Sequence, residues 1–156
     1  MWKKYKPYIL SAVIALAVGA LSSLLTRGNM NIYDDITVPP LAPPMAIFPW
    51  VWGILFILMG ISSAMVYLRR DDADATSALQ IYAIQLVVNF FWSIIFFNMR
   101  AFFFAFIWTM LLWTLIIIMI VQFRKVSKTA ANLQYPYLIW VTFAAYLTLM
   151  IWLLNR

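Results

Sequence analysis

The side chains best suited to specific chemistry in this sequence lie within the stretch 78–97. Its polar and aromatic residues recur at intervals that place them on one face of a helix. They are Tyr82, Gln85, Asn89, Trp92, Ser93 and Phe96. An amide without a partner is costly in an apolar medium, so Gln85 and Asn89 should face protein or a cavity. Two interpretations stay open: hydrogen bonds that join helices, or the polar groups of a binding pocket.

Most catalytic chemistry is excluded by the residue types that the chain lacks. It has no Cys and no His, and all five of its acidic residues are Asp. Thiolate nucleophiles, His-based triads and imidazole metal ligands are therefore excluded, and we predict no metal site. Motifs for binding nucleotide phosphates or a catalytic zinc are also absent. The chain therefore lacks the residues that ordinary acid–base or nucleophilic catalysis needs.

Aromatic stripes on two other stretches point to a site of a particular kind. Phe48, Trp52, Phe56 and Met59 follow one another at helical spacing, and Trp140, Ala144 and Thr148 share a second face with Phe143 beside it. Such stripes are typical of helix packing as well as of ligand sites. If the three faces meet, they favour a pocket for a flat apolar molecule, which would stack on indole rings and be oriented by a few amides.

The segment 27–44 is long for a connection in so short a chain. Pro39, Pro40, Pro43 and Pro44 stiffen it toward extended, polyproline-like geometry, and Tyr33 precedes them. Long ordered loops are often lids or binding elements. The segment is either a stiff spacer or a loop that caps a pocket.

The elements that must position these residues are membrane-spanning helices. Hydrophobic residues make up 66% of the chain and charged residues 10%, against roughly 25% charged in a soluble domain. Too little polar surface remains for a water-facing globule. Five apolar runs, approximately 8–25, 45–68, 78–97, 101–123 and 135–154, are long enough to cross a bilayer. The sequence predicts an all-α integral membrane protein, a single domain over 1–156 with a bundle of five transmembrane helices.

The basic residues predict how the spans are oriented. Eight of the eleven fall on one side: Lys3, Lys4, Lys6, Arg69, Arg70, Arg124, Lys125 and Lys128. Arg27, Arg100 and Arg156 fall on the other. The side rich in basic residues should be cytoplasmic, which leaves the N-terminus inside and the C-terminus outside a membrane that we expect to be a bacterial plasma membrane. The net charge of +6 is then a topology signal, and we predict no nucleic-acid partner.

The first span has a second interpretation. Basic residues before an apolar run, with small residues near its end, also resemble a secretory signal peptide. Small residues at four-residue intervals, however, allow close helix approach in lipid. They are Ser11, Ala15, Gly19 and Ser23. We therefore expect the first span to be part of the mature bundle.

Three blocks of sequence carry a resemblance to a known family. The strongest is A-L-x-x-Y-x-x-Q-L-x-x-N-x-x-W-S-x-x-F-F over 78–97. The second joins Tyr33 to the two proline pairs and to Phe48-Pro49-x-Val51-Trp52, and the third is Pro136-Tyr137-Leu138-x-Trp140-x-x-Phe143-Ala144. With these motifs in order and at matching spacing, the chain resembles the TspO/MBR family, the tryptophan-rich sensory proteins related to the translocator protein or peripheral benzodiazepine receptor.

The resemblance implies a five-helix bundle, usually a homodimer, whose ligand cavity is capped by the loop 27–44. Its implied ligands are tetrapyrroles such as protoporphyrin IX and haem, and synthetic isoquinoline carboxamides or benzodiazepines. The implied ligand-binding residues are Tyr33, Trp52, Phe56, Asn89, Trp92, Trp140, Phe143 and Ala144. The family pattern is not matched everywhere, since Leu41, Phe56 and Thr148 replace residues common in it. A cholesterol motif fails near Tyr146, because no basic residue follows before Arg156.

Three functions are compatible with these observations. The first is a membrane receptor or sensor that binds tetrapyrroles. The second is a light- and oxygen-dependent porphyrin-degrading enzyme in which Trp52 and Trp140 would be the catalytic residues. The third is passive transport of porphyrin, because the spans hold no charge that could couple transport to protons.

Overall fold

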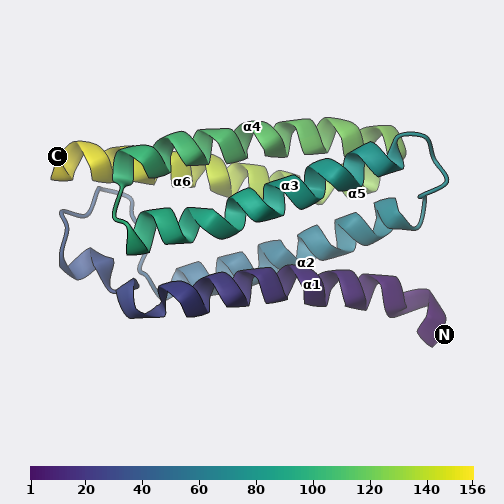
Figure 1. Ribbon diagram of the computed structural model, residues 1–156, viewed down its shortest axis with the longest axis horizontal. Coiled ribbons are helices and arrows are strands. Elements are labelled where there is room, and N and C mark those ends of the chain that lie inside the picture. Colours follow the sequence, from purple (N-terminus) through teal and green to yellow (C-terminus); the bar gives the residue numbers. More distant parts are fainter.

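The computed structural model describes all 156 residues, and its five long helices run alternately up and down along one axis (Figure 1). They are α1 (Trp2–Thr26), α2 (Ile47–Tyr67), α3 (Ala75–Ser93), α4 (Phe102–Val126) and α6 (Tyr135–Asn155). Each is long and apolar enough to cross a membrane. The predicted fold class, an all-α membrane protein with five spanning helices, is confirmed.

The helix ends depart from the predicted spans at three places. Helix α1 begins at Trp2, well before residue 8, because lysines are compatible with a helix that projects out of the bilayer. Helix α3 continues as a short π-helix, η3 (Ile94–Asn98), in which the Met99 N–H donates to the Ile94 carbonyl at 3.0 Å. A short helix, α5 (Lys128–Asn132), precedes α6.

Charged residues gather at the two ends of the bundle. The N-terminus, the α2–α3 connection and α5 lie at one end, and the C-terminus lies at the other with the loop 27–44 and the α3–α4 connection (Figure 1). The eight basic residues counted above therefore share one end, as a single transmembrane orientation requires. Assigning that end to the cytoplasm remains a prediction from the charge distribution.

Helices α1 and α2 approach each other closely in the half of the bundle that includes the N-terminus. A Cβ atom at Gly60 would lie only 2.4 Å from the Cα of Ala12. The small residues of α1 therefore pack against α2 of the same chain, and Ala15 is fully buried there. Close backbone contact of this kind stabilises helix pairs in lipid, where the hydrophobic effect contributes little.

The loop 27–44 is anchored over the other end of the bundle. Its first half forms two 3₁₀ turns, η1 (Arg27–Asn29) and η2 (Ile32–Asp34), so only its second half is extended. Ile32 is fully buried and packs in a small apolar cluster with Phe96 of η3 and Ile151 of α6. This anchor fixes the loop to the end of the helices.

A candidate ligand cavity beneath the loop

A cavity of about 360 Å³ lies between α1, α2, α3 and α6, beneath the loop 27–44. Most of its lining residues are hydrophobic. Six of the eight residues implied by the resemblance line it: Tyr33, Trp52, Phe56, Asn89, Trp92 and Ala144. The three helical faces identified in the sequence therefore meet around one space, under the predicted cap.

Aromatic rings form two walls of the cavity. On α2, the rings of Trp52 and Phe56 lie 5.7 Å apart at an interplanar angle of 33°. On α3 and η3, Trp92 stacks on Phe96 with centroids 5.1 Å apart and planes 12° from parallel. The indole N–H of Trp92 donates to Thr109 Oγ1 of α4 at 2.7 Å, which fixes the orientation of the ring. These walls offer preorganised aromatic surfaces to a flat ligand.

Asn89 supplies the only amide side chain that lines the cavity. Its Nδ2 atom donates to the Tyr137 hydroxyl at 2.6 Å, and that hydroxyl donates to Gln85 Oε1 at 2.7 Å. The polar face of α3 therefore divides by depth. Gln85 is fully buried in the core and joins α3 to α6, whereas Asn89 reaches the cavity. Both amides thus join helices through Tyr137, as the first interpretation expects, and a role of Asn89 in binding stays a prediction.

Trp140 and Phe143 do not line the cavity. The Phe48 ring lies between Tyr33 and Trp140, with centroid distances of 6.3 and 5.6 Å. Phe143 packs against Trp140, with ring centroids 5.7 Å apart. These residues form a second layer behind Phe48, which itself lines the cavity. The Trp140 indole N–H is buried and has no hydrogen-bond partner in the protein.

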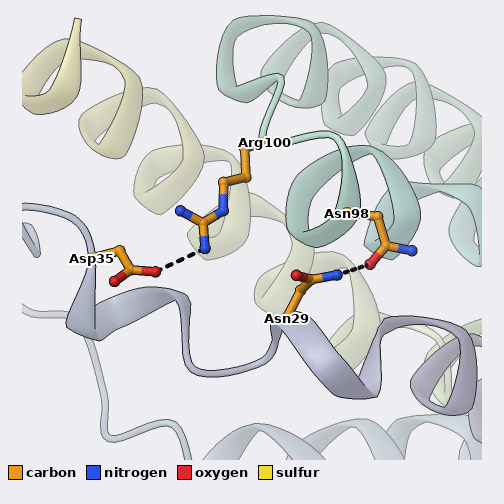
Figure 2. A network of polar contacts seen from close by, with 4 residues as sticks. All are labelled: Asn29, Asp35, Asn98 and Arg100. Carbon is orange, nitrogen blue, oxygen red and sulfur yellow. Dashed lines mark hydrogen bonds and ion pairs between the residues drawn. The ribbon is translucent and has the colours of Figure 1, made fainter.

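Polar contacts attach the loop to the α3–α4 connection (Figure 2). The Asn29 amide donates to Asn98 Oδ1 at 2.8 Å, and Asn98 donates in turn to the Leu25 carbonyl at 3.0 Å. Arg100 forms an ion pair with Asp35 at 2.8 Å. Arg100 has a φ of 49°, in the left-handed region, as the chain turns from η3 into α4. The connection thus holds the loop at two points.

The C-terminal end of α6 attaches the other half of the loop. The Asn155 side chain accepts a hydrogen bond from the Thr37 N–H at 2.7 Å and donates one to the Thr37 carbonyl at 3.0 Å. The Tyr146 hydroxyl donates to the Pro40 carbonyl at 3.2 Å. Loop residues between Asn29 and Pro40 are therefore tied to the α3–α4 connection and to α6, which suits a cap better than a spacer.

Phe48 and Gly19 also line the cavity, although neither is among the residues that the resemblance implies. Phe48 belongs to the aromatic stripe of α2, but its position between the cavity and Trp140 depends on how α2 and α6 are placed. Gly19 belongs to the small-residue face of α1, and it also supports a cavity wall, because a Cβ there would lie 2.5 Å from the Phe56 ring. A glycine in an otherwise apolar helix is the only signal that could have indicated such a contact.

Comparison with known proteins identifies the relatives of this chain. The TspO/MBR family model matches residues 11–153. The chain belongs to the TspO/MBR family. It is 38% identical over 146 residues to the tryptophan-rich protein TspO of Chlorobaculum tepidum, covering 91% of each chain.

More distant members of the family include proteins from bacteria and from mammals. Protein CrtK of Rhodobacter capsulatus is 33% identical over 144 residues, covering 92% of this chain and 89% of the relative. The human translocator protein is 33% identical over 153 residues, covering 97% of this chain and 89% of the relative. The resemblance noted in the sequence is therefore confirmed, and it extends over almost the whole length.

Proposed function

We propose that this protein is a membrane receptor that binds tetrapyrroles, such as protoporphyrin IX or haem, in the cavity beneath the loop 27–44. The observation that carries the proposal is the pairing of two aromatic walls with a single deep amide. Trp52 and Trp92 present rings to the space, and Asn89 supplies the polar contact. A large flat ligand gains affinity from the rings and orientation from the amide.

The cavity also indicates how such a ligand would be placed. About 360 Å³ is near the lower end of the range of roughly 300–1,000 Å³ for ligand sites. A macrocycle would fill the space and leave its propionate groups near the loop end. Arg100 is already paired with Asp35, whereas Arg27 is exposed and forms no ion pair. Arg27 is therefore the better partner for a propionate.

The proposal is tested by titrating protoporphyrin IX into the purified protein in the dark, following tryptophan fluorescence and the Soret band. Trp50 provides a matched control for Trp52, because it lies on the same helix but is 77% exposed on the outer face. We expect Trp52→Ala to weaken binding roughly tenfold, from lost ring stacking and buried area. Trp50→Ala should leave the affinity unchanged. Absence of saturable quenching, or equal losses in the two variants, would refute the proposed site.

A second candidate function is light-driven degradation of the bound porphyrin, with dioxygen as the oxidant. The observation in its favour is that Trp52 borders the cavity, where it could donate an electron to an excited ring. Trp140 would act from behind Phe48. Illumination after the dark titration tests this function. A loss of Soret absorbance that exceeds the loss in empty micelles and disappears in Trp52→Phe would support degradation. A stable spectrum under light would show that the protein binds porphyrin without degrading it.

The same cavity is proposed to accept isoquinoline carboxamide and benzodiazepine-type ligands, which are also flat and aromatic. We further propose that the protein is a homodimer in a bacterial plasma membrane, with its N-terminus in the cytoplasm. A dimer would use lipid-facing surfaces other than the small-residue face of α1, because that face packs on α2. Cross-linking in native membranes tests the dimer, and labelling of single cysteines at each terminus tests the orientation.

A further inference from the structure

A second pocket lies at the opposite end of the bundle from the ligand cavity. Its volume is about 400 Å³, and it is lined by Tyr8, Met65, Leu68, Arg69, Ser127 and Thr129. These residues come from α1, from the end of α2, and from the junction between α4 and α5. The pocket therefore sits where the helices leave the hydrocarbon core, at the end of the molecule that carries most of the basic residues.

Arg69 supplies a fixed positive charge to this pocket. Its Nη1 atom donates to the Val126 carbonyl at 2.7 Å, which holds the guanidinium against the end of α4. That bond uses one of the five N–H donors of the group. No carboxylate pairs with Arg69, since the sole ion pair in the structure joins Arg100 to Asp35 at the other end. The remaining donors are free to bind an anion.

Two aliphatic hydroxyl groups, the Tyr8 side chain and an apolar wall complete the site. Ser127 is largely buried, and its Oγ accepts a hydrogen bond from the Ala130 N–H at 3.2 Å, which leaves its own hydrogen free to donate. Thr129 is exposed and lines the same pocket, so its hydroxyl is accessible to a ligand. Met65 and Leu68 present apolar surface beside these donors. The pocket thus combines a guanidinium, two aliphatic hydroxyls, a phenol and an apolar edge.

We propose that this pocket binds the phosphate headgroup of an anionic phospholipid such as phosphatidylglycerol. The Arg69 guanidinium would contact two phosphate oxygens, and the hydroxyls of Ser127 and Thr129 would donate to the phosphate or to the headgroup glycerol. Arg is well suited to this role because its planar fork matches phosphate geometry. The glycerol backbone and first acyl carbons would then follow Met65 and Leu68 into the bilayer.

An anionic lipid fits better than a zwitterionic one because of the surrounding charge. Eight basic residues lie at this end of the bundle, against three acidic residues, Asp71, Asp72 and Asp74. Among these, Asp72 is already engaged, since its Oδ1 accepts the backbone N–H of Asp74 at 2.9 Å. The net positive field attracts lipids that carry net negative charge and does not attract phosphatidylcholine.

The test is lipid titration of the delipidated protein in mild detergent, with bound lipids counted by native mass spectrometry. Arg70 is the matched control, because it has the same charge at the next position but lies over the Tyr67 ring, at 4.8 Å, outside the pocket. We expect phosphatidylglycerol to bind more tightly than phosphatidylcholine. Arg69→Gln should weaken it about tenfold, and Arg70→Gln by less than about twofold.

Two further variants keep the test decisive if Arg69→Gln fails to fold. Arg69→Lys keeps the charge but loses the planar fork, and Thr129→Val removes one hydroxyl from an exposed position. Each should weaken phosphatidylglycerol binding, by less than Arg69→Gln. Equal weakening in the Arg69 and Arg70 variants would show diffuse attraction and overturn the site. Equal binding of the two lipids, or full competition by inorganic phosphate, would overturn the anionic-lipid assignment.

Discussion

Asn89 donates a hydrogen bond from its Nδ2 atom to the hydroxyl of Tyr137 across 2.6 Å, joining α3 to α6 at the inner end of the ligand cavity. The same hydroxyl donates to Gln85, one turn deeper. Tyr137 is 1% exposed, so no water competes for these groups. One phenol therefore satisfies two amides that would otherwise be costly to bury, and it sets the orientation of the amide that faces the cavity.

Tyr137→Phe should destabilise the protein, because it leaves both amides without this partner. Hydrogen bonds between membrane helices average about 0.6 kcal/mol, but orphaned buried groups cost about 1–3 kcal/mol. We expect a loss of free energy of unfolding in the second range, measured by denaturation in mixed micelles. The matched control is Tyr135→Phe, whose hydroxyl lies at the exposed helix end and accepts a bond from Arg124. A loss no larger than that of the control would show that the network contributes little.

Gly60→Ala should separate α1 from α2. Its new methyl group would meet the backbone of Ala12 at 2.4 Å, and backbone cannot rotate away as a side chain can. We expect destabilisation of about 1–3 kcal/mol from overpacking. Gly53→Ala on the same helix is the control, because no atom lies within 4 Å of its Cβ position. Its effect should be neutral or stabilising. Equal unfolding free energies for the two variants would contradict the close approach.

Gly19→Ala should affect ligand binding more than stability. Its methyl group would meet the Phe56 ring at 2.5 Å, and a side chain can move. Because Phe56 lines the cavity, the displaced ring would occupy ligand space. We expect porphyrin affinity to fall several-fold, by about 1 kcal/mol, with a small change in melting temperature. Gly28→Ala serves as control, since its Cβ position is open. Unchanged affinity in Gly19→Ala would mean that Phe56 moves elsewhere.

The contacts that hold the loop should differ in strength and in salt dependence. The Arg100–Asp35 pair is 41% and 55% exposed at its two side chains, and such pairs contribute about 0–1 kcal/mol and are screened by salt. Asn155 binds both backbone groups of Thr37, and neither bond involves a charge. Asn155→Ala should therefore accelerate amide hydrogen exchange over residues 33–38 more than Asp35→Asn does.

Only the effect of Asp35→Asn should diminish at high salt. Asn132→Ala, an exposed change at the other end of the bundle, should leave amide exchange in the loop unchanged at low and at high salt. If exchange in the loop is equally fast in all three variants and the parent protein, these contacts do not restrain the loop.

The amino-acid sequence alone determined the features that follow from the bilayer. Long apolar runs require helices, because lipid cannot satisfy backbone hydrogen bonds. The unequal numbers of Arg and Lys at the helix ends distinguish one end of the bundle from the other. The polar face from Gln85 to Phe96 also identified the side of α3 that is turned inward, since amides avoid lipid.

Only the tertiary structure decided which inward-facing residues meet. In a membrane bundle the surfaces that face lipid and those that face protein are both apolar, so hydrophobic periodicity does not give the rotation of a helix about its axis. The family resemblance implies that Trp140 and Trp52 share one site, whereas the structure places Phe48 between Trp140 and Tyr33. The hydrogen bonds of Gln85 and Asn89 likewise depend on Tyr137, which lies on α6, 48 residues after Asn89. Such contacts depend on how helices distant in sequence pack, and that is fixed by the shapes of all the side chains between them.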